Sequence, residues 1–413
     1  MTMGSGSANT VLCLAGFEKG HEFIRACKHL GSRVILVTVS SLEAADWPRE
    51  SIDEFFHMPD LYAVDAVIRG VSYLTRTRQI DRIVALDDFD VQTAAALREH
   101  FRMPGMGDTV ARRFRDKLAM RTEARRAGIR VPDFVGIFNY DRIREFMARV
   151  PPPWVLKPRG EAAAVGIKKV QHPDELWPLL DQLGDKQSFY LLERYVPGDV
   201  YHVDSLVVDY EPVFAEAHQY GRPPMDVVQQ GGLFVTRTLP RGSAEDTALK
   251  AMSRQVIQSF GLERGATHME FIKGREDGEF YFLETAARVG GAHIADVIDA
   301  ATGVNLWAEW GRIELANPGE YQLPTPRQDY GGAIITLARQ EYPDTSAYQD
   351  PEIVLRVEKA HHAGFVVASP DAGRVQSLLD EYSQRFYHDF HTAMPQMQDR
   401  DEIRQAYGVV HQR

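Results

Sequence analysis

Cysteine is nearly absent from this sequence, since Cys13 and Cys27 are the only two among 413 residues. A disulfide scaffold or a cysteine-based zinc site is therefore not expected, and a reducing cytoplasm suits the composition best. Long apolar runs are missing as well, because no segment approaches the length of about 20 residues that a membrane helix needs. The apolar run at 11–17 lacks the basic segment and cleavage site of a signal peptide, so it is interpreted as a strand.

Basic residues are outnumbered by acidic ones, 47 against 58, which gives a formal net charge of −11. This balance argues against a nucleic acid or an anionic membrane as a partner of the whole surface. It leaves room for a local basic pocket that binds a phosphorylated ligand. The 44% hydrophobic and 25% charged residues are typical of soluble globular domains, and the length allows roughly two to three of them.

Two common nucleotide-binding motifs are also absent. No Gly-Lys dipeptide occurs, which excludes a Walker A loop. No Gly-x-Gly-x-x-Gly follows the first apolar run, which weakens a dinucleotide-binding interpretation. The phosphate-binding elements must therefore be of another kind, if the protein has them.

The first hundred residues alternate between apolar runs and helical patterns. The apolar runs lie at 11–17, 33–39 and 81–88, and helical spacing occurs at 21–30 and 91–101. Apolar strands that alternate with helices predict a parallel sheet covered on both faces. Met103-Pro104-Gly105 then interrupts the pattern and marks a boundary. We expect a disordered start at 1–9 and an α/β domain at 10–105.

Beyond this boundary, short strands and turns indicate an α+β region. One helix is expected at 113–127, and another is predicted from the Ser243 cap to Gly261. The expected units are a two-lobed domain at 106–320, with an N-lobe to about 190 and a C-lobe from about 191, and a C-terminal α/β cap at 321–413 with a helix near 372–385.

A hairpin at 267–285 carries two carboxylates that could bind a metal ion. With a turn near Glu276, Glu270 is expected opposite Phe282 and diagonal to Glu284, at roughly 7–8 Å between backbones. Two carboxylates at that spacing can hold Mg²⁺ through oxygen ligands. The alternative is that both are solvated charges on an exposed sheet face.

Two further segments could contact a nucleotide. Lys157 ends an apolar strand and is followed by a loop of small residues from Gly160 to Gly166, which lets backbone N–H groups approach phosphate oxygens. The segment 189–207 could present backbone groups of Glu193 and Val196 to a planar heterocycle. The alternatives are a surface hairpin turn for the first segment and an exposed Glu193 in the second.

Together these motifs resemble the ATP-grasp superfamily, and within it the carboxylate–amine ligase branch. The resemblance rests on the order of its motifs over roughly residues 10–320. The motifs are Lys117 in RDKLAMRTEARRAGIRVP, Lys157 with its loop, Glu193-Arg-Tyr-Val-Pro-Gly, Glu270, and Glu284 followed by TAARVGG. It implies an ATP-grasp fold with an N-terminal Rossmann-like pre-ATP-grasp domain and a C-terminal cap.

The resemblance also implies a role for each matching residue. Lys117 and Lys157 would bind the ATP phosphates under the loop from Gly160 to Gly166, and Glu270 and Glu284 would hold Mg²⁺ or Mn²⁺. The adenine site would be formed by Ile167, Glu193, Tyr195 and Val196, and the ribose would be contacted by His202, by Asp204 or by neither. Arg288 would bind the acyl phosphate or the carboxylate that forms it. Gly290 and Gly291 would let the backbone approach the substrate closely.

Three departures from the family pattern keep a degenerate nucleotide site open as an alternative. Ala286 stands where the family usually has a metal-binding Asn, and the phosphate loop is rich in alanine rather than glycine. The family often has an acidic ribose contact soon after the hinge, where this sequence has Asp199, Val200, Tyr201 and His202.

The expected function is an ADP-forming ligase that joins a small carboxylate to an amine through an acyl phosphate. ATP and both small substrates would be its partners, without nucleic acid or membrane, and the superfamily allows a homodimer. The alternatives are a bicarbonate-activating carboxylase and a nucleotide-binding regulatory subunit.

Overall fold

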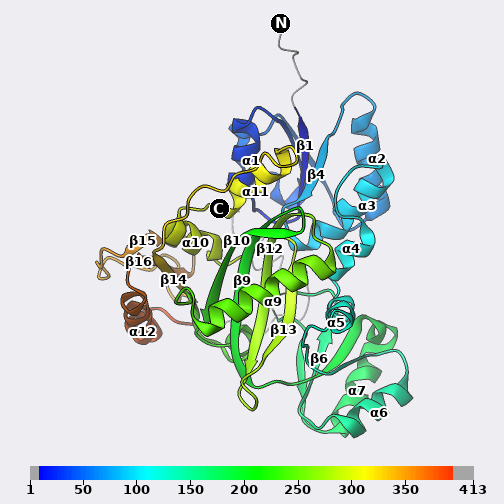
Figure 1. The fold of residues 1–413 in the computed structure, drawn as a ribbon, viewed down its shortest axis with the longest axis vertical. Helices are drawn as coiled ribbons and strands as arrows, with labels where there is room; N and C mark the ends of the chain where they lie inside the picture. The colour runs from blue at the N-terminus through cyan, green and yellow to red at the C-terminus, as the bar shows by residue number, and fades with distance from the viewer. Residues whose placement is uncertain (1–8, 163, 394–413) are drawn as a thin grey trace, which may run out of the picture.

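A computed structural model describes residues 9–162 and 164–393 of the chain, and three sheets organise this part (Figure 1). The N-terminal sheet is parallel, with strand order β3-β2-β1-β4. Its strands are β1 (Thr10–Ala15), β2 (Arg33–Val39), β3 (Glu54–Met58) and β4 (Arg82–Ala85), and its helices are α1 (His21–His29), α2 (Val64–Thr75) and α3 (Val91–Phe101). The predicted parallel layer is confirmed. The layer also contains β3 and α2, which the sequence did not predict. The β3 segment, Glu-Phe-Phe-His-Met, lies at the edge of the sheet and has no continuous apolar run that would have indicated a strand.

The connection to the next sheet contains two helices where one was expected at 113–127. These are α4 (Asp108–Arg113) and α5 (Lys117–Arg126). The chain breaks at Asp116, whose carboxylate accepts hydrogen bonds from the backbone N–H groups of Leu118 and Ala119. This cap starts α5 afresh, and Lys117 becomes its first residue.

A small antiparallel sheet follows, with strand order β5-β8-β6-β7. Its strands are β5 (Phe134–Gly136), β6 (Trp154–Pro158), β7 (Lys168–Val170) and β8 (Tyr190–Arg194). Helices α6 (Tyr140–Arg149) and α7 (Pro173–Leu183) pack against it through a cluster centred on Trp154 and Leu180, at the lower right of Figure 1.

The central sheet has eight strands in the order β13-β12-β9-β10-β11-β14-β16-β15. They are β9 (Gly198–Val208), β10 (Glu211–Tyr220), β11 (Phe234–Thr238), β12 (Arg264–Gly274), β13 (Phe280–Ala286), β14 (Tyr330–Leu337), β15 (Ile353–Arg356) and β16 (His362–Ser369). The last three strands come from the region expected to be a separate cap. They extend the central sheet rather than forming a sheet of their own, because β14 pairs with β11.

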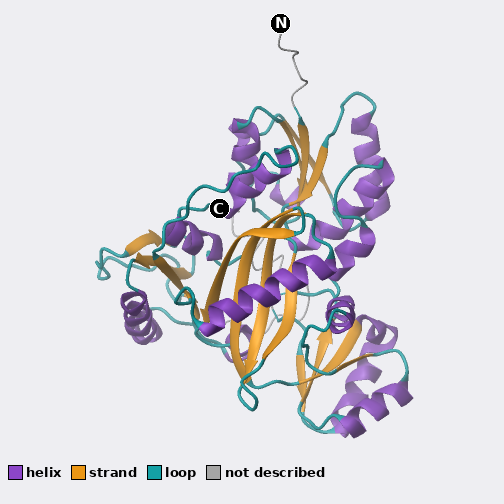
Figure 2. Ribbon diagram, viewed as in Figure 1, coloured by secondary structure: helices purple, strands orange, loops and turns teal. Residues whose placement is uncertain are grey.

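The helices of this part are α8 (Pro224–Gln230), α9 (Ala244–Phe260), α10 (Ile294–Thr302), α11 (Leu306–Leu315) and α12 (Ala372–Asp389). Figure 2 shows α9 crossing one face of the central strands. It begins as predicted, with the Ser243 hydroxyl accepting from the Asp246 N–H, and it ends at Gly261 in a left-handed conformation. None of the helices in the described part is long and apolar enough to span a membrane.

The central sheet and the N-terminal domain share one core. Helix α11 packs on α1, with the rings of Trp310 and Phe23 5.2 Å apart, and buried residues of both units form one cluster. The N-terminal domain is thereby held on the face of the central sheet opposite α9.

Replacing Phe282 tests the packing of the central sheet against α9. Phe282 is fully buried, and its ring lies 5.6 Å from that of Phe260 and 5.9 Å from that of Phe271. Because its removal leaves a cavity, Phe282→Ala should lower the free energy of unfolding by about 3–5 kcal/mol in urea titrations. Tyr342→Ala is the control, since that side chain is 79% exposed. Equal effects of the two substitutions would contradict the packing.

Candidate active site

A cavity of about 1190 Å³ is lined by strand residues of the small and central sheets and by N-terminal residues that follow β1, β2 and β4. The predicted site residues that line it are Lys117, Lys157, Ile167, Glu193, Tyr195, Val196, Glu270, Glu284, Arg288, Gly290 and Gly291. Gly160, Gly166 and His202 do not line it. Residues from motifs far apart in the sequence therefore meet in one place.

The two candidate metal ligands are direct neighbours. Glu270 pairs with Glu284 across β12 and β13, whereas Glu270 was expected opposite Phe282. The expected register is wrong for two reasons. Phe282 pairs with Phe271, one residue away from the expected partner, and a bulge at Leu283 shifts the pairing by one further residue. Directly opposed residues have Cβ atoms about 4.5–5.5 Å apart, closer than the expected diagonal.

The donor set at this position suits a hard divalent cation. Two carboxylates supply oxygen ligands, and Mg²⁺ usually takes one or two carboxylates together with water and phosphate oxygens. Burial raises the pKa of Glu284, but ion pairing, first with Lys117 at 3.0 Å, outweighs it and lowers the pKa to about 2. Glu284 is therefore ionised at neutral pH, as a metal ligand must be. Ala286 also lines the cavity and supplies no ligand atom.

Lys157 belongs to a buried group of charges. Its ammonium forms an ion pair with Glu193, whose Oε2 also accepts from Arg121 Nε at 3.0 Å. Glu193 is 2% exposed, so the alternative of a surface residue is wrong. Burial raises the pKa of Glu193, but Arg121 and Lys157 lower it further than burial raises it.

The expected adenine edge at Glu193 needs a correction. Strand β8 is paired with β5 and β6 at this residue, so Glu193 presents no free strand edge. Tyr195 and Val196 follow the end of β8 and line the cavity, as does Ile167. The ammonium of Lys169 lies 3.7 Å from the centre of the Tyr195 ring.

Lys117 connects the metal position to the phosphate loop. Its ammonium lies 3.0 Å from Glu284 Oε2 and donates to the carbonyl of Glu161 at 2.6 Å. In the loop, Gly166 has a φ of 69°, which favours glycine, whereas a Cβ at Gly160 would meet nothing within 4 Å. Ala163 lies outside the described residues.

The phosphate loop also touches the N-terminal domain. Val165 is buried with Phe17 and Phe89. Arg115 donates both to Asp88 and to the carbonyl of Gly160, and its guanidinium lies 4.7 Å from the centre of the Phe89 ring. Sequence reasoning did not identify Arg115. Its partner Asp88 is one of the two carboxylates at the end of the 81–88 run. That position was an available signal, because polar ligand-binding groups lie at the carboxyl ends of parallel strands.

Arg288 lines the cavity and has one N–H group without an acceptor among the described residues. Its Nη1 donates to the carbonyl of Val289 at 2.8 Å, while its buried Nε has no hydrogen-bond partner among the described residues. A cavity-lining guanidinium with an unused N–H is suited to an oxyanion. Gly290 must be small, since a Cβ there would lie 2.6 Å from Asp204 Oδ1.

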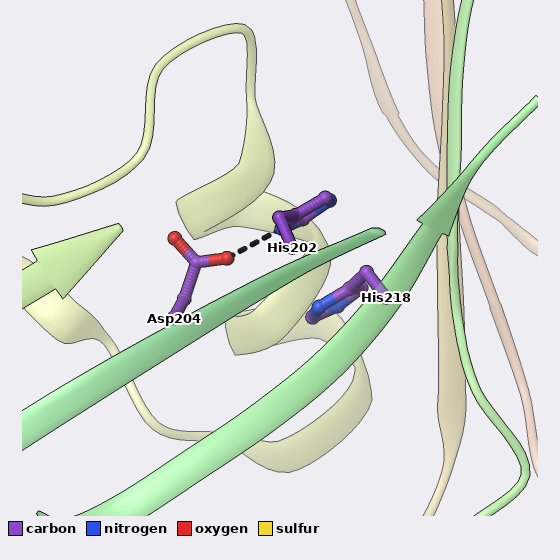
Figure 3. Close-up of side chains that lie close together, drawn as sticks. All are labelled: His202, Asp204 and His218. Atoms are coloured by element: carbon purple, nitrogen blue, oxygen red, sulfur yellow. Dashed lines mark hydrogen bonds and ion pairs between the residues drawn. The ribbon is translucent and has the colours of Figure 1, made fainter. Parts of the chain in front are cut away.

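His202 lies in the sheet rather than at a ribose position. It is fully buried, its Nδ1 is 2.6 Å from Asp204, and its Nε2 is 2.7 Å from the Thr236 hydroxyl. Its ring stacks on His218 with centroids 4.7 Å apart, as Figure 3 shows. His202 and Asp204 are both fully buried and neither lines the cavity, which favours the alternative that neither contacts the ribose.

The family model for an ATP-grasp domain matches residues 150–296. This segment includes Lys157, Glu193, Glu270, Glu284 and Arg288. The chain therefore contains an ATP-grasp domain, and the resemblance inferred from motif order is confirmed.

Individual relatives extend the match beyond this segment. The chain is 26% identical to the L-arginine-specific L-amino acid ligase of Bacillus subtilis over 234 residues, which cover 55% of this chain and 56% of that protein. The match thus spans little more than half the length of that curated relative.

Solved structures match over nearly the whole chain. An L-amino acid ligase from Bacillus licheniformis superposes with a TM-score of 0.73 at 15% identity, covering 94% of this chain and all of that one. The biotin carboxylase domain of 2-oxoglutarate carboxylase from Hydrogenobacter thermophilus, in complex with MgADP, ADP and bicarbonate, gives 0.66 at 16% identity, covering 90% and 88%. These likenesses confirm the ATP-grasp fold.

Replacing Glu193 tests the buried charges behind the site. At neutral pH, Glu193→Gln leaves Lys157 and Arg121 without their counter-charge, and the free energy of unfolding should fall by about 3–5 kcal/mol. Because the pKa of Glu193 is lowered in the folded state, its contribution is present above the unfolded-state pKa of about 4.3 and is lost as the pH falls below it.

The gap between wild type and Glu193→Gln in urea unfolding should therefore shrink as the pH falls from neutral to below about 4. Glu279→Gln, at a side chain that is 54% exposed, is the control and should show no such gap. A gap that is independent of pH would contradict the role of the Glu193 carboxylate.

Proposed function

We propose that the protein is an ATP-dependent ligase that joins the carboxylate of one amino acid to the amine of another, releasing ADP and phosphate. The observation that carries this proposal is the meeting of Glu270, Glu284, two lysines and Arg288 around one cavity. Named relatives that are amino-acid ligases support the substrate class.

Lys117 and Lys157 are the proposed phosphate ligands. Both are now neutralised by carboxylates, Lys117 by Glu284 and Lys157 by Glu193. The phosphates of ATP carry enough negative charge to share these ammonium groups. The adenine would lie beyond the end of β8, beside Tyr195, Val196 and Ile167.

Glu270 and Glu284 are the proposed ligands of Mg²⁺, which when bound would neutralise charge on the transferring phosphate. Glu284 then has two possible partners on the same side of the cavity, Lys117 and the cation. The fixed pairing of β12 with β13 holds the two carboxylates side by side before any ligand arrives.

In the first step, an oxygen of the substrate carboxylate attacks the γ-phosphorus, and the bond to the ADP oxygen breaks. The products are an acyl phosphate and ADP. Arg288 lines the cavity, and its guanidinium would meet the carboxylate or the acyl phosphate there. This step needs positioning and charge neutralisation rather than a covalent nucleophile.

In the second step, the amine attacks the acyl carbon, an amide bond forms, and phosphate leaves. An acyl phosphate hydrolyses readily, so the cavity must exclude water. The burial of Val165 between Phe17 and Phe89 supports this role for the phosphate loop, because it closes the loop against the N-terminal domain.

A bicarbonate-activating carboxylase is the second candidate. The observation that favours it is the structural likeness to a biotin carboxylase domain. The two functions differ in their co-substrate, since only the ligase requires two amino acids for phosphate release.

A matrix of amino-acid pairs with ATP and Mg²⁺ tests the proposal. Phosphate release should require both amino acids, and mass spectrometry should detect the condensed dipeptide. Release that depends on bicarbonate alone would favour the carboxylase. Nucleotide binding without turnover for any pair would favour a regulatory protein.

Glu284→Gln should reduce the rate of product formation by about 100-fold or more, because it removes a charged metal ligand from the transition state. Glu276→Gln is the matched control, since Glu276 lies exposed in the turn between the same two strands. Steady-state kinetics of both variants check this expectation. Equal rates would refute the assignment of Glu284.

Arg288→Lys keeps the positive charge but removes the planar fork. We expect kcat to fall by about 100-fold with a smaller change in the KM for ATP, because the interaction with the acyl phosphate is lost. Arg275→Lys, at a side chain that is 69% exposed, should behave as wild type. An effect confined to the KM for ATP would place Arg288 at the nucleotide instead.

A further inference from the structure

A row of polar side chains runs from the metal position into the central sheet. Across β13, β12, β9 and β10, the register places Glu284, Glu270, His202 and His218 in line. Beside this row, His268 on β12 pairs with Asp204 on β9. His202, Asp204 and His218 have no exposed surface. Asp204 and His202 are partners of each other, whereas neither ring nitrogen of His218 has a hydrogen-bond partner among the described residues.

The row makes its first contacts at Glu270. The hydroxyl of Tyr220 donates to Glu270 Oε1 at 2.9 Å, and His268 Nε2 lies 3.7 Å from the same oxygen. The Tyr220 hydroxyl is also 3.4 Å from His268 Nε2. Both groups engage Oε1, so neither occupies Oε2.

His268 is in turn held by Asp204. The Oδ1 of Asp204 is 2.9 Å from His268 Nδ1, and its Oδ2 is 2.6 Å from His202 Nδ1. His202 is fixed from its other side by Thr236 at 2.7 Å. Each ring is therefore fixed in orientation by a buried partner.

His202, Asp204 and His218 also have ligand atoms within 4.8 Å of one another (Figure 3). Such a group could hold a metal ion, but both ring nitrogens of His202 are engaged by Asp204 and Thr236. An ion here would have to displace these contacts. The geometry favours an orienting network over a second metal site.

We propose that Tyr220, His268 and Asp204 are positioning residues that hold the Glu270 carboxylate through its Oε1 and leave Oε2 available to a metal ion. This inference rests on the proposed function, because the metal-binding role of Glu270 belongs to it. Removing a side chain that hydrogen-bonds to a metal ligand typically lowers the metal affinity by about 10–100-fold, whether the ligand is a histidine or a carboxylate.

Binding of Mn²⁺ in the presence of ADP, followed by electron paramagnetic resonance, tests the inference without turnover. Tyr220→Phe removes only the hydroxyl and should weaken Mn²⁺ binding by about 10-fold or more. Tyr201→Phe is the control, because Tyr201 is equally buried but packs in the cluster beneath α9. It should bind Mn²⁺ as the wild type does.

Two substitutions of His268 separate its two contacts. His268→Asn can keep a donor toward Asp204 but loses the nitrogen that faces Glu270. His268→Gln can instead keep the nitrogen that faces Glu270. Mn²⁺ binding should be weakened more by His268→Asn, and circular dichroism should show the same fold for both. The comparison remains informative if one variant does not fold, since Tyr220→Phe changes a single atom.

Wild-type affinity in both Tyr220→Phe and His268→Asn would overturn the inference, as would a wild-type protein that binds no Mn²⁺ with ADP. The proposed function fails in a different way. If Mn²⁺ and ADP bind and the variants weaken Mn²⁺ binding, but no dipeptide forms with any pair, the network stands and the ligase activity is refuted.

Discussion

The site depends on one completely buried arginine, Arg121 of α5. Its guanidinium donates to Glu193 on β8 and to the carbonyl of Leu283 on β13. It therefore joins the small sheet, which carries Lys157, to the central sheet, which carries the paired glutamates. Leu283 is also the bulge residue, so Arg121 contacts β13 at the point where its register shifts and Glu270 comes to lie opposite Glu284. A buried charge tolerates little displacement, because a lost partner leaves a costly uncompensated group.

Charge pairing extends this constraint through the cavity. The chain as a whole is acidic, with a net charge of −11. Lys117 and Lys157 nevertheless lie on the cavity wall, and each forms an ion pair with a carboxylate. This arrangement stabilises the protein before a nucleotide arrives. A triphosphate that binds with its cation would therefore replace the present partners of these lysines rather than bring the first charges into an uncharged pocket. Catalysis would then require less reorganisation of the site.

Much of the fold and of the site could be predicted from local signals. Apolar runs defined the parallel sheet, the Ser243 cap and Gly261 bounded α9, and the order of the charged motifs indicated ATP-grasp. What local signals could not show were long-range contacts. The carbonyl of the bulge residue Leu283 accepts a hydrogen bond from Arg121, which lies 162 residues away in sequence. The family resemblance offered His202 as a ribose contact, but the sequence could not distinguish a residue that lines the cavity from one covered by its neighbours.

The N-terminal domain takes part in the site through contacts that no nucleotide motif announces. Arg115 joins Asp88, at the end of a parallel strand, to the first carbonyl of the phosphate loop, and Phe17 and Phe89 cover Val165. The same domain is held against the central sheet by α11. If the loop opened, it would lose an apolar contact and a charge-assisted hydrogen bond together, so loop closure is coupled to the N-terminal domain by both kinds of interaction. A domain that seems remote from phosphate chemistry in sequence thus forms part of the wall of the proposed active site.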